Sequence, residues 1–285
     1  MKLNYYPGCS ATSTGQELDL SVRAVLAALG VELQELEDWS CCGASSAHAT
    51  NRALAVALPA RNLAIAQRSG LDLLAPCAAC YSRLKTADYV MRHDATKKGE
   101  VEAQVAFEFT GSYQVRSPID VVVRDIGLDA VRSRVLKPLA GLKAVGYYGC
   151  LLVRPPEVVA FDDPEHPVML DQILGALGME VCRWSYATDC CGGGLNLTKS
   201  SVAVRLVGRL TQFAREAGAD AIVTACPLCQ MSLEMRQTGN GSRMPVVYFT
   251  ELMGLAFGLK ETSGWWKKHL VDPRPWLGAL AAGGA

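Results

Sequence analysis

Short apolar runs alternate with amphipathic stretches along the first half of the chain. A short apolar run bounded by turn residues predicts a strand, whereas apolar residues that recur every three or four positions predict a helix. Gly30 is placed to end the first helix, and Pro59 starts or kinks the second one. The predicted elements are strands over residues 3–6, 31–36 and 71–75, and helices over residues 18–29, 51–68 and 81–91.

The second half repeats this alternation. Strands that alternate with helices form βαβ units with parallel sheets. The predicted fold class is therefore α/β, with two similar domains made of parallel-sheet βαβ units. Residues 94–141 contain no cysteine and are predicted to hold helices and the connection between the halves. The predicted elements of the second half are strands over residues 143–147, 179–184, 221–224 and 245–249, and helices over residues 170–177 and 202–213.

The cysteines divide into two sets with nearly the same spacing. From Cys41 to Cys190 is 149 positions, and the same shift relates three further pairs. Cys9 and Cys150 differ by only 141 positions, so the first gap of the two sets differs in length. The first set is Cys9, Cys41, Cys42, Cys77 and Cys80, and the second set is Cys150, Cys190, Cys191, Cys226 and Cys229.

The residues beside the cysteines repeat as well. Segments 5–9 and 147–150 both place two tyrosines shortly before Gly-Cys, and segments 28–30 and 176–178 both read Ala-Leu-Gly. Spacing and flanking residues that repeat together indicate an internal duplication. The sequence therefore predicts a first domain over residues 1–141, which includes connecting helices, and a second over residues 142–285 with a C-terminal extension.

The cysteines of each set follow the ends of predicted strands. Cys9, Cys41 and Cys77 come after the three strands of the first half, and the second set is placed in the same way. Ligands of open α/β sheets gather at the carboxyl ends of parallel strands. Glycines such as Gly8 and Gly149 suit tight turns close to a bulky ligand. We therefore expect each set of five to meet at one edge of a sheet.

Composition and charge narrow the function classes. Lysine plus arginine equals aspartate plus glutamate at 28 each, so neither nucleic acid nor an anionic membrane is expected as a main partner. The first residues lead directly into a predicted strand without a signal peptide, and no apolar run of about 18 residues predicts a transmembrane segment. These features predict a cytoplasmic protein. Thiols stay reduced in that compartment, so ten repeated cysteines indicate metal rather than disulfides.

Three interpretations of the cysteines remain open at this point. Buried structural thiols are the expectation for Cys182, which lies in a predicted strand and has no repeat partner. Zinc suits the two Cys-x-x-Cys motifs, but a structural zinc site closes with four ligands and each set offers five. The side chains of adjacent cysteines diverge and reach different metal atoms. Five thiolates from three strand ends favour a polynuclear iron–sulfur cluster.

The pattern of one Cys, then Cys-Cys-Gly, then Cys-x-x-Cys resembles the cysteine-rich CCG domain. Two copies over nearly the whole chain resemble the B-subunit family of heterodisulfide reductase. Leu151 is a departure, because methanogen-type members often have histidine after the cysteine that matches Cys150. A related reductase, or a sulfur-oxidising heterodisulfide reductase-like complex, therefore stays open. Further segments agree with the resemblance: residues 137–139, 149–155, 161–164 and 271–273.

The resemblance implies a cofactor, an activity and partners. In that family, each complete set of five cysteines binds a noncubane 4Fe–4S cluster, and a disulfide is cleaved between the two clusters. It implies that the first set binds one cluster and the second set the other, with a small thiol or disulfide as substrate. Because the chain has no flavin or nicotinamide fingerprint and no ferredoxin-type cysteine run, electrons are expected from a ferredoxin-type iron–sulfur subunit and a flavin subunit.

Other polar residues near the cysteines are weaker candidates. His48 follows Cys42 closely and is expected to lie at the surface or to cap a helix, although its position also suits proton donation. Arg83, Lys85 and Arg154 follow cysteines and are expected to be solvated charges, with binding of an anionic thiol as the alternative. The segment 265–268 is amphipathic and suits either partner docking or packing.

Two functions compete beside the zinc interpretation. The first is an enzyme subunit that reduces or forms disulfides at its clusters. The second is an electron-transfer subunit, similar to the CCG-containing subunits of lactate, glycolate or succinate oxidoreductases. The sequence identifies neither the thiol substrate nor the physiological direction.

Overall fold

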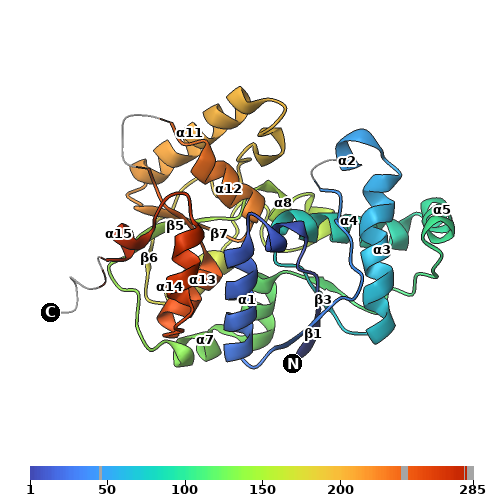
Figure 1. Ribbon diagram of the computed structural model, residues 1–285, viewed down its shortest axis with the longest axis horizontal. Helices are drawn as coiled ribbons and strands as arrows, with labels where there is room; N and C mark the ends of the chain where they lie inside the picture. The colour runs from blue at the N-terminus through green and yellow to red at the C-terminus, as the bar shows by residue number, and fades with distance from the viewer. Residues whose placement is uncertain (45–46, 239–242, 279, 281–285) are drawn as a thin grey trace.

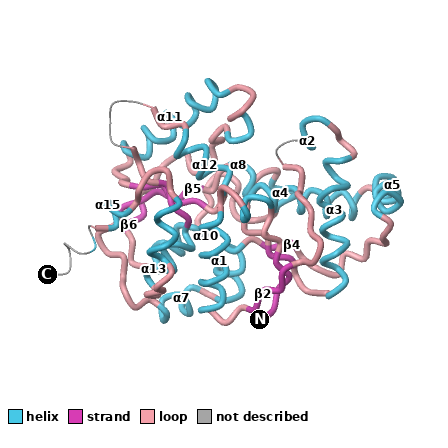
Figure 2. The backbone as a smooth tube through the Cα atoms, viewed as in Figure 1, coloured by secondary structure: helices cyan, strands magenta, loops and turns pink. Residues whose placement is uncertain are grey.

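Two parallel sheets form the framework of the protein in the computed structural model, which describes residues 1–44, 47–238, 243–278 and 280. The strand orders are β2-β1-β3-β4 and β6-β5-β7-β8, and Figure 2 shows the strands in two separate groups. The strands are β1 (Lys2–Tyr5), β2 (Glu32–Glu35), β3 (Leu73–Leu74), β4 (Val115–Arg116), β5 (Lys143–Tyr147), β6 (Glu180–Val181), β7 (Ala221–Thr224) and β8 (Val246–Tyr248).

The two sheets have the same topology and register. Lys2 is paired with Glu32 across β1 and β2, and Lys143 is paired with Glu180 across β5 and β6. A lysine–glutamate ion pair joins the same two positions in each sheet, at 3.0 and 2.9 Å. These exposed pairs contribute little stability, but they mark equivalent positions. The predicted α/β fold with an internal duplication is confirmed.

Helices connect the strands and cover the sheets (Figure 1). Those of the first half are η1 (Cys9–Thr12), α1 (Gln16–Ala28), α2 (Ala47–Thr50), α3 (Leu54–Ala66), η2 (Gln67–Ser69), α4 (Ala78–His93), α5 (Ala95–Val105), α6 (Pro118–Asp120), the π-helix η3 (Val121–Ile126) and α7 (Leu128–Arg134). Those of the second half are α8 (Cys150–Val153), α9 (Pro156–Val159), α10 (Met169–Ala176), η4 (Gly193–Leu195), α11 (Ser200–Glu216), α12 (Pro227–Met235), α13 (Phe249–Ala256), α14 (Thr262–Trp265), η5 (Trp266–Lys268) and α15 (Arg274–Leu277).

Several elements differ from the sequence prediction, which also omits α12 and α13 of the second half. Strand β4 lies in the segment where only helices and a connection were expected, because a two-residue strand leaves no detectable periodicity. The predicted helix over residues 51–68 is α3, which begins at Leu54 and contains Pro59, followed by the short η2. Strand β6 ends at Val181, before the predicted end at residue 184, and the Trp184 indole instead donates to the Gly146 carbonyl at 2.9 Å.

Helices of each half pack against helices of the other half at their boundary. Helix α1 of the first half packs against α13 of the second, where the hydroxyls of Ser21 and Thr250 are 2.7 Å apart, and Figure 1 shows α1 beside α13 and α14. In return, α10 of the second half packs against α6 and η3 of the first. Each domain therefore completes the core of the other, which fixes how the two cysteine sets face each other.

Within the described residues, none of the helices has the length and apolar character needed to cross a membrane.

Candidate functional site

Glycines at the ends of the first strands bring the backbone close to the cysteine sulfurs. Gly8 has a φ of 73° and Gly149 a φ of 66°, a left-handed conformation that disfavours side chains. A β-carbon at Gly8 would lie 3.0 Å from Cys80 Sγ, and one at Gly149 would lie 3.2 Å from Cys229 Sγ. The sequence places glycine here because the chain must turn tightly against a sulfur of its own set.

The sulfurs of each set converge. In the first set, Cys42 Sγ lies 3.4 Å from Cys80 Sγ, and Cys41 Sγ lies 3.9 Å from Cys9 Sγ. In the second set, Cys191 Sγ lies 3.4 Å from Cys229 Sγ. All ten cysteines of the two sets are free thiols. The structure therefore gathers these side chains from distant segments, as the strand-end positions predict.

Backbone and helix geometry favour thiolates at both sets. Cys77 and Cys226 are the N-cap residues of α4 and α12, where the helix dipole stabilises negative charge. The amide of Gly43 donates to Cys41 Sγ at 3.4 Å, and the amide of Gly192 donates to Cys190 Sγ at 3.3 Å. The same geometry in both halves indicates the same chemistry at both.

Neighbouring thiols also separate the pKa values within each set. Hydrogen bonds from Cys41 and Cys80 lower the pKa of Cys42 to about 3. A hydrogen bond from Cys150 lowers the pKa of Cys190 to about 6. In each case the partner thiol keeps its proton. Cysteine binds a metal as a thiolate. Each set therefore contains one sulfur whose lowered pKa favours metal binding.

The two sets touch at one point. Hydrogen bonds from Cys229 and then Cys77 lower the pKa of Cys226 well below its usual value. Correspondingly, the hydrogen bond to Cys226 raises the pKa of Cys77. Cys77 and Cys226 belong to different sets and different halves, so the two sites share a boundary.

A cleft of about 460 Å³ opens onto the first set. All five cysteines of that set line one wall. Residues of the second half form the other wall, and its side chains are mostly apolar or thioether groups. Such a lining disfavours ordered water and suits a soft, apolar sulfur compound. The second-half residues that line the cleft are Gly193, Gly194, Asn196, Leu197, Thr198, Leu228, Met231, Met235 and Arg236.

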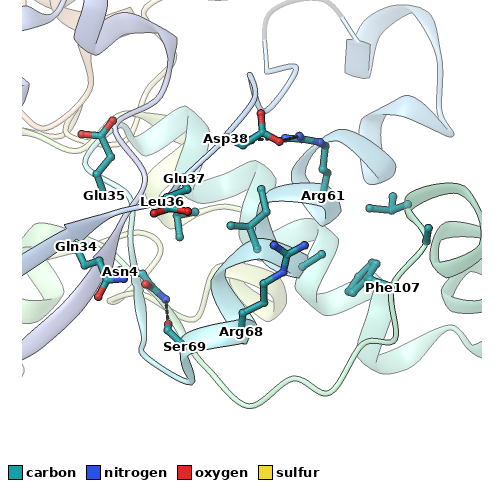
Figure 3. Close-up of a pocket in the computed structure, with 14 residues that line it drawn as sticks. Asn4, Gln34, Glu35, Leu36, Glu37, Asp38, Arg61, Arg68, Ser69 and Phe107 are labelled. Carbon is teal, nitrogen blue, oxygen red and sulfur yellow. Dashed lines mark hydrogen bonds and ion pairs between the residues drawn. The ribbon is translucent and has the colours of Figure 1, made fainter.

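A separate hollow of about 490 Å³ lies between β2 and α3 (Figure 3). No cysteine lines it. Some of its polar side chains bind one another, since Asn4 donates to Ser69 at 2.7 Å and Arg61 pairs with Asp38. Because the cysteine sets lie elsewhere, this hollow is not the candidate site.

The donor sets suit a polynuclear group. The sulfurs lie in pairs, with glycine backbone beside them. A soft donor set spread over several strand ends fits an iron–sulfur cluster.

Comparison with known proteins agrees with this geometry. The model of the cysteine-rich CCG domain matches residues 3–85 and again residues 144–234. The chain belongs to the CCG cysteine-rich domain family. Both copies in this CCG protein contain a complete cysteine set, and membership of the family implies iron–sulfur clusters.

Curated relatives are similar over most of their length. The 8-methylmenaquinol:fumarate reductase membrane anchor subunit of Wolinella succinogenes is 31% identical over 90% of this chain and 92% of its own. The B-subunit of the ferredoxin/F420H2-dependent CoB-CoM heterodisulfide reductase of Methanosarcina acetivorans is 28% identical over 90% of this chain and 89% of its own. A heterodisulfide reductase B-subunit-like protein of Archaeoglobus profundus is also 28% identical. The resemblance to the B-subunit family of heterodisulfide reductase is therefore confirmed.

A solved structure shows the same fold. A hypothetical protein from Helicobacter pylori matches 95% of this chain with a TM-score of 0.71 and 11% sequence identity. The CCG protein spans about half of that structure, 52% of its length. At this identity, the likeness concerns the fold alone.

The structure decides several of the expectations for single residues, and it corrects those for Cys182 and Arg83. Cys182 follows the end of β6 and is half-buried rather than buried inside a strand. Trp265 and Trp266 are buried in the core, so packing and not partner docking explains them. Arg154 pairs with Glu165 at 2.6 Å, as a surface charge would. Arg83 differs from that expectation, because its Nε is fully buried.

The sequence analysis missed one buried ionic group of this CCG protein. The His269 ring lies 3.0 Å from Glu234 and 3.0 Å from Glu251, and all three side chains are at most 1% exposed. Glu234 belongs to α12, which also contains Cys229. Burial alone would lower the pKa of His269, but Glu251 and Glu234 raise it to about 10. No local signal identifies this histidine, because its partners come from distant segments.

Proposed function

We propose that this chain is the iron–sulfur subunit of a heterodisulfide reductase-like complex that reduces or forms disulfides of small thiols. The cleft that all five cysteines of the first set share with residues of the second half is the observation that carries the proposal, and the proximity of Cys77 to Cys226 agrees with it. This proximity brings two complete cysteine sets to a shared boundary beside a cleft lined by apolar and thioether groups. A disulfide needs two electrons, and two adjacent one-electron centres match that need.

Each set would hold one noncubane 4Fe–4S cluster. Five thiols per set, with an adjacent Cys-Cys pair, exceed what a closed tetrahedral ion uses. When bound, the clusters would supply one-electron transfer and soft iron for sulfur. The proposed ligands are Cys9, Cys41, Cys42, Cys77 and Cys80 for one cluster, and Cys150, Cys190, Cys191, Cys226 and Cys229 for the other.

The chain's own residues would bind the substrate and exclude water. Leu228, Met231 and Met235 form an apolar wall opposite the first set. At the same wall, Arg236 is fixed by Asn196, whose carbonyl accepts from the guanidinium at 2.7 Å. A cleft of this kind would hold a sulfur compound against the cysteine set, and positioning of this type accelerates reactions strongly.

Electron paramagnetic resonance with added thiols tests this proposal. Anaerobically purified protein in its oxidised state is titrated with small thiols, and the cluster signals are recorded. A changed signal that broadens with sulfur-33 thiol would place substrate sulfur at a cluster. Intact clusters whose spectra stay unchanged with every thiol would contradict the disulfide chemistry.

A second candidate is electron transfer alone, as in a succinate- or fumarate-type oxidoreductase. The identity of 31% to a fumarate reductase subunit favours it. Turnover of a disulfide with an artificial electron donor separates the two functions, because a relay protein reduces no disulfide on its own.

The proposed partners are a ferredoxin-type iron–sulfur subunit and a flavin subunit. Relatives are named as subunits of reductases, which supports a multi-subunit assembly. A cytoplasmic location and a domain division between residues 141 and 142 stay predictions from the sequence.

A further inference from the structure

Arg83 lies between the two cysteine sets. It is three residues after Cys80 on α4, which is about one helical turn. Helix α4 packs against α8, whose first residue is Cys150 of the second set. The guanidinium interacts electrostatically with Cys42 of the first set and with Cys150 of the second. One side chain of the first half is therefore close enough to both sites to interact with their charge.

This guanidinium has no acidic partner of its own among the described residues. Its Nε is fully buried and has no hydrogen-bond acceptor there. Other arginines differ: Arg92 on the same helix pairs with Asp88 at 2.9 Å, and Arg116 pairs with Asp125 at 2.7 Å. A half-buried cation without a partner is costly. The sulfurs of the two sets are the negative groups that it does face.

The internal duplication shows that this cation is not a general part of the fold. The position three residues after Cys229, which corresponds to Arg83, is Ser232. Ser232 donates to the Cys191 carbonyl at 3.0 Å and is fully buried. The ten proposed ligands are present in both halves, but the arginine is present in the first half alone. We therefore relate Arg83 to the two sites together and not to each site separately.

His48 is another cation close to this region. It interacts electrostatically with both Arg83 and Cys42, and it is exposed. Burial is the largest cause that lowers the pKa of His48, and the charge of Arg83 is the second. A neutral imidazole leaves Arg83 as the permanent positive charge beside Cys42.

We propose that Arg83 balances the negative charge of both cysteine sets and raises the reduction potentials of the two clusters together. This inference rests on the proposed function. Reduction adds an electron to a site already surrounded by thiolates, and a nearby positive charge makes that step easier. Net charge and hydrogen bonds to sulfur are established determinants of iron–sulfur potentials. An arginine keeps its charge at every physiological pH.

A potentiometric titration of the whole protein tests the inference. The variants are Arg83→Gln, which removes the charge, and Arg83→Lys, which keeps it. Arg205→Gln is the matched control, since Arg205 is an exposed arginine on α11. We expect both cluster potentials to become more negative in R83Q, to stay close to the wild-type values in R83K and to be unchanged in R205Q.

The outcomes separate this inference from the proposed function. Wild-type protein without iron and sulfide would defeat both. Two clusters in the wild type, with potentials unchanged in R83Q or shifted at one cluster only, would overturn the role of Arg83 alone. If R83Q does not bind clusters, the R83K variant decides. Clusters with near wild-type potentials in R83K would support the proposed role of the positive charge. Loss of the clusters in both variants would contradict that role.

Discussion

Cys77 of the first set and Cys226 of the second set lie close enough for each to shift the pKa of the other. Each residue is the N-cap of a helix, so two helix N-termini meet at this contact. The Tyr248 hydroxyl lies in the same buried region and has no hydrogen-bond partner among the described residues. Two redox sites joined at this point would exchange electrons over a short distance and act on one substrate together.

Metal and sulfide analysis is the first check of the site. We expect anaerobically prepared protein to contain about eight irons and about eight sulfides, because two complete five-cysteine sets are present. Chemical iron and sulfide assays with an absorption spectrum measure this directly. Stoichiometric zinc without sulfide would mean that the cluster interpretation is wrong.

Cysteine replacements distinguish ligands from bystanders. Cys182→Ala should keep the full iron content, because Cys182 is half-buried and outside both sets. Cys191→Ser should lose about four irons and retain much of the other cluster. It should also abolish disulfide turnover, since one remaining centre delivers a single electron. Loss of iron in the Cys182 variant would show that the wrong ten cysteines were chosen.

Gly8→Ala should damage the first cluster site. The new β-carbon would lie 3.0 Å from Cys80 Sγ, and the backbone at Gly8, with φ 73° and ψ 165°, is in a region essentially restricted to glycine that costs about 1–3 kcal/mol for other residues. We expect lower iron content and a lower unfolding temperature. Gly127→Ala is the matched control: Gly127 has a similar backbone conformation, with φ 86° and ψ 147°, and nothing lies within 4 Å of the new β-carbon. It should lose stability but keep its iron, and equal iron loss in both would argue against crowding of the sulfur.

His269→Gln should destabilise the fold by about 3–5 kcal/mol, because two buried carboxylates lose their cation. His93→Gln, at an exposed position, is the control and should change little. Thermal or denaturant unfolding of both variants measures the difference.

The effect of His269→Gln should depend on pH. The folded pKa of about 10 lies above the ordinary value of 6.5, so the protonated ring stabilises the fold. That contribution is fully present below pH 6.5 and is lost as the pH rises through 10. The difference between wild type and variant should shrink over this range. A difference that stays constant would indicate a role in packing alone.

The isolated chain should not oxidise NADH. Its glycine run at residues 192–194 lacks the strand–turn–helix context of a dinucleotide site, and η4 there is a single short turn. A spectrophotometric assay with NADH and a disulfide should show no turnover until donor subunits are added. NADH oxidation by the chain alone would contradict the proposed dependence on partners.

Local signals in the sequence determined the fold class and the cysteine sets. Apolar periodicity predicted most strands and helices, because each reflects burial of one face. The repeated spacing of cysteines and Cys-Cys-Gly revealed the duplication directly. Periodicity failed for β4, where two residues carry no pattern, and for the end of β6, which stops at Val181 and not at the predicted residue 184.

Tertiary structure alone decided what lies between the two halves. The contact of Cys77 with Cys226, the ionic group around His269 and the position of Arg83 all join segments that are far apart in sequence. No periodicity or motif specifies such contacts, because they arise when α1 packs on α13 and α4 packs on α8. The sequence determines which sulfurs belong to each set. Packing of the duplicated domains determines which charged side chains lie near each set and which residues form the cleft beside it.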